Sequence, residues 1–451
     1  MCALRHDDAG ARTTGASRGL DTRPAMMQYS PSEVSAVLGV RASRLGLAVR
    51  RVGPAAGLAA LVVSLAAPVA AAAQAPQPAP ATFWQGVPVI RAAPAVGEHT
   101  PATAGLAAAF WARPQVRWAV SNGWVTKAGP RNFGPSTLIH RLGAAKVLAL
   151  AYQQRTGTAM WSDPYQEAVK LGWIGSGSGP TGTITQHGFD SGIVNMLGMH
   201  AAAARYGTLH EANGRRVRLP LGFGAEQIVR HLGVRLNAPA GDDTWEWWPQ
   251  DRLVRAELAI EAYQLAHLPS WAPAWAASQA AVAGQLPTWT PLQRQVLGYA
   301  IRFAGAPYVW GGTSDRNQVL FGRPAVGGFD CSGFVWWVLK LHRYRLAGGR
   351  AWSAAIAGRT TYSMARALPV SRRIPYSRLR PGDVLFWSDK TPHGVSTHWE
   401  HIFHTGIYLG NGWTIDSHGL GDGVTIDRMT PGSGWYHDFF AFGWRLLPRG
   451  Q

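Results

Sequence analysis

Cysteine is almost absent from this sequence, which has only Cys2 and Cys331 among its 451 residues. If the first stretch of the chain is removed on export, Cys331 is the one thiol of the mature protein. A single thiol cannot form an internal disulfide, so we expect that disulfides do not stabilise this fold even in an oxidising compartment. A lone cysteine is either a small buried hydrophobe or a reactive group, and its sequence neighbours must decide between the two.

Acidic residues are also scarce, with 25 Asp and Glu against 43 Lys and Arg and a formal net charge of +18. Charged residues make up only 15% of the chain and hydrophobic ones 47%, which excludes a disordered protein and allows a large core in two or three domains. A basic exported protein is drawn to anionic surfaces. We therefore expect the anionic polymers of a bacterial wall as partners and no nucleic acid.

A long uninterrupted apolar run is missing as well. The run over residues 55–73 is broken by Gly57 and Pro68, follows four arginines between residues 41 and 51, and ends in small residues that suit a signal peptidase. Residues 1–75 are therefore interpreted as a cleaved signal peptide of a secreted protein, in preference to a permanent membrane span. Translation starting at Met26 or Met27 would give the same mature chain.

After a Pro/Ala-rich linker over residues 76–111, weak self-similarity with a period of about fifty residues extends over 112–268. Such repeats predict stacked helical pairs that bury their faces only together. The units resemble S-layer homology repeats: the Arg-Ala-Glu at 255–257 is the best match, Arg141 holds the equivalent place in the first unit, and the middle unit departs from the signature with Gln-His-Gly at 186–188.

The resemblance implies anchoring to wall polymers, with Arg141 and Arg255 as binding residues. An arginine suits a carboxylate or phosphate because its planar fork bonds two oxygens at once. The alternative is a helical spacer without a ligand. A second linker, rich in Pro, Ala and Trp, covers residues 269–289.

The last segment, residues 290–451, carries four motifs in order. They are Pro-Tyr-Val-Trp-Gly-Gly at 307–312, Asp-Cys-Ser-Gly-Phe at 330–334, Arg-Pro-Gly-Asp at 380–383 and His-Thr-Gly-Ile-Tyr-Leu-Gly at 404–410. Apolar spacing predicts a helix that begins at Pro291 and ends at Gly305, and a buried helix over 332–341, capped at Asp330. Turn signals predict strands at 384–387, 403–409, 413–416, 424–426 and 440–446. A helix beginning at Cys331 would favour its thiolate.

These motifs closely resemble the NlpC-type (NlpC/P-sixty) cell-wall cysteine peptidases. The resemblance implies an α+β fold, a papain-like catalytic domain in which the helix bearing the cysteine packs on an antiparallel sheet, here preceded by the all-α repeat domain. It implies Cys331 as nucleophile and His404 as base. Tyr308, Trp310, Asp330 and Ser332 are expected to contact the substrate, and backbone amides at the start of the cysteine helix to bind the oxyanion. We further expect Gly406 to leave room for that helix beside the imidazole.

The third catalytic member departs from the family pattern. Twelve residues after the base, where the family has His, Asn or Gln, this chain has Asp416, with His418 two residues later. Register favours Asp416 and residue type favours His418; we prefer Asp416. A metal site formed by His393, His398, His401 and His404 would need a helix, whereas the sequence here indicates a loop and a strand, so no metal and no cofactor are expected.

The function predicted from the sequence is a secreted peptidoglycan hydrolase, a D,L-endopeptidase that cleaves stem-peptide bonds by a Cys-His thiol mechanism while the repeats hold it to the wall. Two alternatives remain open. One is an amidase or transpeptidase on the same scaffold, because the same acyl-enzyme can react with water or an amine. The other is a wall-binding structural protein with an inactive peptidase fold.

Overall fold

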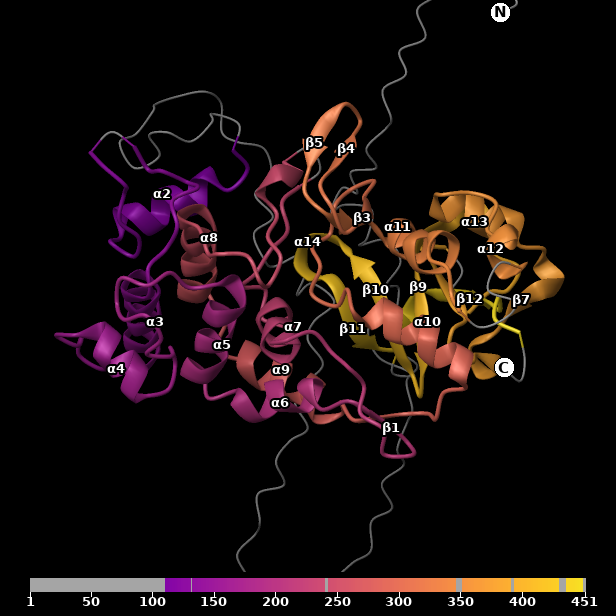
Figure 1. Ribbon diagram of the computed structural model, residues 1–451, viewed down its shortest axis with the longest axis horizontal. Helices are drawn as coiled ribbons and strands as arrows, with labels where there is room; N and C mark the ends of the chain where they lie inside the picture. The colour runs from indigo at the N-terminus through magenta and orange to yellow at the C-terminus, as the bar shows by residue number, and fades with distance from the viewer. Residues whose placement is uncertain are drawn as a thin grey trace, which may run out of the picture. The chain divides into compact units, whose positions relative to one another are not determined.

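The computed structural model describes residues 110–130, 132–239, 242–345, 351–390, 393–429 and 435–448, and residues 72–451 form one compact unit (Figure 1). The predicted signal peptide lies outside the described residues, as does the first linker apart from its last two residues. In the part of the chain that the structure describes, no helix is both long and apolar enough to cross a membrane.

Residues 113–266 are helical and contain three successive helix pairs. The pairs are α2 (Arg113–Ser121) with α3 (Arg141–Thr156), α4 (Pro164–Lys170) with α5 (Gln186–Met196), and α7 (Phe223–His231) with α8 (Arg255–Ala266), while α6 (His200–Gly207) lies between the second and third pairs. Local chemistry starts several of these helices. Asp163 caps α4 ahead of Pro164, and the hydroxyl of Thr185 caps α5.

The second helix of each pair follows an extended segment, and the three segments hydrogen-bond to one another in a ring. The N–H of Ile139 donates to Leu253 O (2.9 Å), the N–H of Leu253 to Ile184 O (3.0 Å), and the N–H of Ile184 to Ile139 O (3.3 Å). All three side chains are buried. The pairs therefore close around a common centre instead of stacking in a line, which the sequence did not predict.

The remaining elements lead into the C-terminal domain. Helix α9 (Ala272–Ala281) is followed by β2 (Gln285–Leu286), which pairs in parallel with β1 (His210–Glu211). Helix α10 (Pro291–Ile301) starts where the apolar spacing predicted, at a capping box formed by Thr290 and Gln293, and ends four residues before Gly305. Two small hairpins follow, β3 (Thr313–Ser314) with β6 (Gly328–Phe329) and β4 (Gln318–Leu320) with β5 (Arg323–Ala325).

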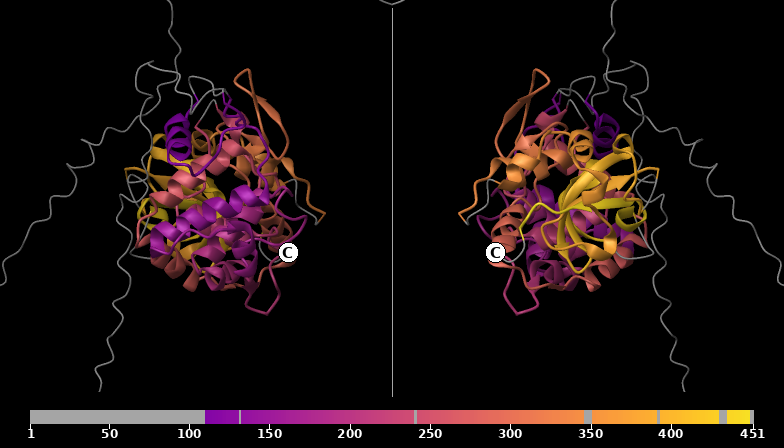
Figure 2. Two further views of the ribbon diagram at one scale, coloured as in Figure 1. Left: turned by 90° about the vertical axis from the view of Figure 1, so that its left-hand side faces the viewer. Right: turned by 90° about the vertical axis from the view of Figure 1, so that its right-hand side faces the viewer.

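The C-terminal domain is built on a six-stranded antiparallel sheet of order β11-β10-β9-β8-β12-β7. Figure 2 shows the yellow C-terminal strands of this sheet side by side. Its strands, in chain order, are β7 (Arg373–Ile374), β8 (Val384–Ser388), β9 (Ile402–Gly410), β10 (Trp413–His418), β11 (Gly423–Arg428) and β12 (Phe440–Trp444). Short helices connect or flank them: α12 (Ala351–Ala355), α13 (Thr361–Ala367), α14 (Gly419–Asp422) and α15 (Trp435–Asp438).

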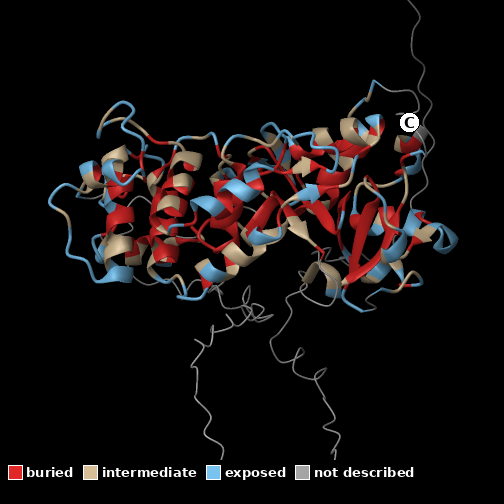
Figure 3. Cartoon of the chain, turned by 90° about the horizontal axis from the view of Figure 1, so that it is seen from below, coloured by how far each residue is buried: buried red, intermediate tan, exposed pale blue. Residues whose placement is uncertain are grey.

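Helix α11 (Cys331–Trp336) packs against β9 and β10 and continues as a π-helical turn, η4 (Trp337–Leu341). Every residue of β8 and β12 is buried, because both faces of the sheet are covered (Figure 3). The α+β fold with the cysteine helix on an antiparallel sheet is thus confirmed.

Candidate active site

Helix α11 begins at Cys331 because Asp330 caps it. One carboxylate oxygen of Asp330 accepts the N–H of Gly333 (2.6 Å), and the other accepts the N–H of Gly311 (3.0 Å). Position 333 must be glycine, since a Cβ there would lie 1.8 Å from the carbonyl oxygen of Gly312. The 307–312 motif therefore packs directly under the start of the cysteine helix.

Asp330 and Ser332, both predicted to contact substrate, are engaged inside the protein. The Ser332 hydroxyl donates to Asp330 (3.1 Å), and Arg359 donates to both side chains, at 3.0 Å and 2.7 Å. Arg359 also donates to the carbonyl oxygen of Gly312 (3.0 Å). These contacts fix the backbone around Cys331, and a substrate-contacting role for the two side chains stays a prediction.

The thiol of Cys331 lies against the middle of the sheet. Its sulfur is 3.5 Å from the Thr361 hydroxyl, and backbone N–H groups of Thr405 and Ser332 donate toward it. Burial, together with the negative charge of Asp330, nevertheless raises the pKa of Cys331 to about 12. The expectation of a thiolate is wrong for the free protein, because the desolvation of the charged form outweighs the hydrogen bonds that favour it.

His404 lies on β9, next in sequence to Thr405, and its Nε2 is 2.6 Å from Oδ2 of Asp416 on β10. Aromatic rings surround the imidazole: the ring centroids of Trp387 and Trp435 are 5.1 and 5.3 Å away. Burial, with repulsion from His418, lowers the pKa of His404 well below its usual value, and burial raises that of Asp416. His404 is therefore a neutral imidazole at neutral pH, as a general base must be.

Gly406 makes the contact between His404 and Asp416 possible. Thr414 lies opposite Tyr408 and Ile415 opposite Ile407, and the same register extended by one residue places Asp416 opposite Gly406. A Cβ on residue 406 would lie 2.7 Å from the Cβ of Asp416. The expectation that Gly406 makes room for the cysteine helix is corrected here: the space is filled by Asp416, which leans across toward the imidazole two residues away.

The two candidates for the third member have different partners. Asp416 is fully buried and bonds His404, whereas Nδ1 of His418 is 3.0 Å from Asp422. The rings of His418 and His404 lie close, 4.9 Å apart and almost perpendicular. The hydrogen bond to Asp422 raises the pKa of His418 against the effect of its burial, which lowers it. The geometry thus favours Asp416 as the residue that orients His404.

The other residues predicted to bind substrate or wall polymer are Tyr308, Trp310, Arg141 and Arg255. Tyr308 is close enough to Cys331 and Asp330 for both to raise its pKa, after the larger effect of burial. Trp310 is 54% exposed on the same loop. Arg141 donates to the carbonyl of Gly175 (2.6 Å). Arg255 donates to the carbonyls of residues 133 and 134, and polymer binding by both arginines stays a prediction.

Within the described residues, no group of three or more His, Cys, Asp or Glu side chains is arranged to hold a metal ion. The histidines of the loop before β9 contact other groups instead: His398 lies 3.4 Å from Glu400, His401 lies 3.9 Å from Asp389, and the rings of His393 and His437 are 4.5 Å apart.

Three residues near the site were missed from the sequence. Arg359 stands alone in a coil, and Trp435 and Tyr436 follow a glycine-rich segment with no strand or helix pattern. The hydroxyl of Tyr436 lies 3.3 Å from Asp416 Oδ2. The one available signal was composition, since an aromatic pair just before a predicted strand is unusual for an exposed loop.

Comparison with known proteins finds relatives of the C-terminal domain. Residues 305–443 match the NlpC/P60 family. The peptidoglycan endopeptidase RipB of Mycobacterium tuberculosis is 32% identical over 164 residues, which are 35% of this chain and 58% of that protein. The gamma-D-glutamyl-L-lysine dipeptidyl-peptidase of Bacillus subtilis is 28% identical over 128 residues, 28% of this chain and 33% of that protein.

The murein DD-endopeptidase MepH of Escherichia coli is 31% identical over 127 residues, which cover 28% of this chain and 36% of that protein. The solved RipB structure of Mycobacterium tuberculosis is 26% identical, covering 36% of this chain and 69% of that chain, with a TM-score of 0.24. This chain spans no more than a third of the length of the first curated relatives that it matches. The domain that carries Cys331, His404 and Asp416 belongs to the NlpC/P60 family.

Proposed function

We propose that this protein is a cysteine endopeptidase that hydrolyses a peptide bond in the stem peptides of peptidoglycan, such as the bond between D-isoglutamate and the diamino acid. The observation that carries the proposal is the buried pair of His404 and Asp416 on the strands against which the Cys331 helix packs. The names of the relatives, which include two peptidoglycan endopeptidases and a gamma-D-glutamyl-L-lysine dipeptidyl-peptidase, support the substrate class.

The resting pair is a neutral thiol and a neutral imidazole, since burial raises the pKa of Cys331 and lowers that of His404. Proton transfer therefore accompanies attack. Because Asp416 occupies Nε2 of His404, Nδ1 is the nitrogen that takes the thiol proton while the sulfur adds to the scissile carbonyl carbon. Asp416 then stabilises the imidazolium that forms.

Breakdown of the adduct completes the reaction. The imidazolium gives its proton to the amine as the C–N bond breaks, which leaves a thioester on Cys331. Water, deprotonated by His404, attacks the thioester, and the thiol leaves with the returned proton, so the products are one amine and one carboxylic acid. The backbone N–H of Cys331 is suited to bind the oxyanion in both steps, because the N–H groups of Ser332 and Gly333 already donate to the Cys331 sulfur and to Asp330. Tyr308 is close enough to Cys331 for the two groups to interact electrostatically.

We also propose that residues 112–268 hold the secreted enzyme on anionic wall polymers. Support comes from the excess of basic over acidic residues, which remains without residues 1–75, and from the three helix pairs, in which Arg141 and Arg255 begin the second helices at equivalent positions. The third such position is Gln186, a neutral residue. The expected binding surfaces are thus the two that have an arginine.

The test is digestion of purified sacculi by the full chain and by Cys331→Ala, with the released fragments identified by mass spectrometry. Wild type should release fragments with new amino and carboxyl ends at one stem bond, and the variant should release none. Free stem peptides joined to an added amine would instead indicate a transpeptidase, and loss of the glycan link an amidase. Identical fragment patterns from the two proteins would refute the enzyme and leave the wall-binding structural protein.

A further inference from the structure

Helix α7 of the helical region meets the catalytic domain at strand β11. Its last residue, His231, is 5% exposed and places Nε2 2.9 Å from Oδ1 of Asp427. One turn earlier, the side-chain carbonyl of Gln227 accepts the backbone N–H of Ile426 (3.3 Å). Helix α7 also packs against α14, which connects β10 to β11. Residues almost 200 positions apart thus share a buried polar contact.

That contact continues to the catalytic histidine. The Tyr436 hydroxyl lies 3.1 Å from Oδ2 of Asp427 and 3.3 Å from Oδ2 of Asp416, so it bridges the two carboxylates. Asp416 in turn bonds Nε2 of His404 at 2.6 Å. Four polar contacts therefore link His231 of the helical region to the proposed base of the reaction, and the two carboxylates share the single Tyr436 proton.

We propose that His231 is a positioning residue for the active site, which acts on His404 through Asp427, Tyr436 and Asp416. The inference rests on the proposed function in one respect, the identity of His404 as the base. It gives the helical region a role in positioning His404, separate from wall binding. The catalytic domain without the helical region would lack the contact with His231.

The electrostatics explain why such a partner is needed. Asp416 faces His404, His418 and Tyr436 together with two further carboxylates, Asp427 and Asp422. Both of those carboxylates raise its pKa, adding to the effect of burial. A protonated Asp416 could not stabilise an imidazolium. A charge that compensates Asp427 therefore keeps Asp416 closer to ionisation.

His231 is built to supply that charge. It faces Asp427 on β11, the more distant Asp422 on α14, the amide of Gln227, and the rings of Tyr206 and Trp275, at 5.8 Å each. Burial lowers its pKa, but the hydrogen bond and charge of Asp427 outweigh burial and raise it overall. The same bond lowers the pKa of Asp427 against the effect of burial. Both shifts favour a positive charge on His231 and a negative charge on Asp427.

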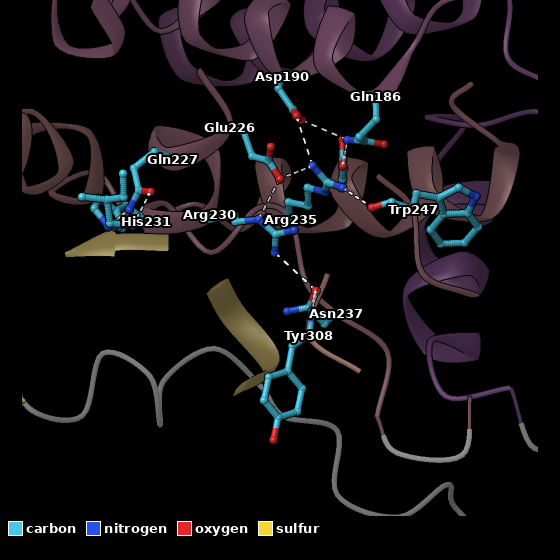
Figure 4. Close-up of polar contacts among 12 residues, drawn as sticks. Gln186, Asp190, Glu226, Gln227, Arg230, His231, Arg235, Asn237, Trp247 and Tyr308 are labelled. Atoms are coloured by element: carbon cyan, nitrogen blue, oxygen red, sulfur yellow. Dashed lines mark hydrogen bonds and ion pairs between the residues drawn. The ribbon is translucent and has the colours of Figure 1, made fainter. Parts of the chain in front are cut away.

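A second connection from α7 reaches the other side of the site (Figure 4). Arg230, which bonds Glu226 at 3.0 Å, donates to Oδ1 of Asn237 (3.4 Å), and the same oxygen accepts the backbone N–H of Tyr308 (3.2 Å). The amide of Asn237 donates to the carbonyl of Gly419 (2.9 Å), where α14 begins. Neighbouring residues of one helix therefore hold both Tyr308 and the strands that carry the catalytic pair.

The experiment compares the full chain with His231→Gln, which keeps a hydrogen-bond donor but removes the charge. We expect kcat on stem-peptide substrate to fall about tenfold with KM unchanged, and the acidic limb of the kcat/KM profile to move to higher pH, because Asp416 becomes harder to ionise. The matched control is Glu211→Gln. It breaks another ion pair between the same two regions, Glu211 with Arg294 at 2.7 Å, which lies outside the linked residues and whose carboxylate is also buried.

Both variants should lose stability, but only His231→Gln should change kcat and the pH profile. Equal changes in the two variants, or a wild-type profile in His231→Gln, would overturn the proposal. If His231→Gln does not fold, Tyr436→Phe removes one hydroxyl from the middle of the link and must give the same loss of kcat. In the double variant the losses should not add, since both changes cut one connection.

A readout without substrate separates this proposal from the proposed function. The rate at which iodoacetamide alkylates Cys331 depends on proton transfer to His404, whatever the enzyme cleaves. At pH 7 alkylation should be several-fold slower in His231→Gln than in wild type or Glu211→Gln. Slower alkylation in a protein that digests no sacculi would refute the proposed substrate and keep the positioning role, whereas unchanged alkylation together with normal digestion would refute the positioning role alone.

Discussion

Replacing Asp416 by Asn tests the orientation of His404 most directly. The substitution preserves shape but removes the charge that stabilises the imidazolium. The buried 2.6 Å hydrogen bond involves an ionised group in the transition state. Such a bond contributes about 1.5–3 kcal/mol, and since each 1.36 kcal/mol is tenfold in rate, its loss costs about 10- to 150-fold. The Asn amide can also donate to Nε2, which would put the proton on Nδ1 and remove the base.

We therefore expect kcat/KM of Asp416→Asn to fall about 100-fold or more, with KM nearly unchanged, in an assay of stem-peptide cleavage. Oδ1 of Asp416 has no hydrogen-bond partner, and burial raises the pKa of the carboxyl, so the neutral amide should not lower the thermal stability. His418→Asn is the matched comparison and should cost less than fivefold. Full activity in Asp416→Asn together with loss in His418→Asn would show that the assignment is wrong.

Three further predictions follow from the same geometry. Gly406→Ala should lower activity more than tenfold in the same assay, because the added Cβ would lie 2.7 Å from the Cβ of Asp416. The free energy of unfolding, measured by chemical denaturation, should fall by about 1–3 kcal/mol. A Gly406→Ala variant with normal kcat would contradict this prediction. The pKa of Cys331 is about 12 in the folded protein, against 9.0 for an ordinary cysteine. Between these two pH values the unfolded state binds fewer protons than the folded state, so the free energy of unfolding falls as the pH rises. Cys331→Ala should flatten that fall, and equal slopes would argue against a buried neutral thiol. Asp330→Ala removes a helix cap and takes from Arg359 its carboxylate partner. We expect the free energy of unfolding in urea to fall by about 2–3 kcal/mol. A fall of less than about 0.5 kcal/mol would mean that the cap is dispensable.

The sequence predicted α10, α11 and the strands β8 to β12 of the catalytic domain, because each of these has a local signal. The turn at 410–412 determines where β9 ends and β10 begins, and Asp330 marks the start of α11. Residue spacing also indicated that Asp416 rather than His418 matches the family position.

The sequence did not predict contacts between residues far apart in the chain, or the effect of burial on pKa. Nothing near His231 indicates a partner 196 residues later, and nothing near Tyr436 indicates that its hydroxyl bridges two carboxylates. The thiol was expected to be ionised because the helix start is visible in the sequence, whereas the desolvation that opposes ionisation arises only from the packing of α11 on the sheet.

The ring formed by Ile139, Ile184 and Leu253 limits how this protein can evolve. Each residue gives its N–H to one neighbour and its carbonyl to the other, so the ring has no free donor or acceptor at which a fourth unit could be added. An open stack of repeats can lengthen by duplication of a unit, whereas a closed ring of three must break one of its hydrogen bonds to gain a unit and two of them to lose one. Substitution within a unit, as at Gln186, leaves all three hydrogen bonds in place.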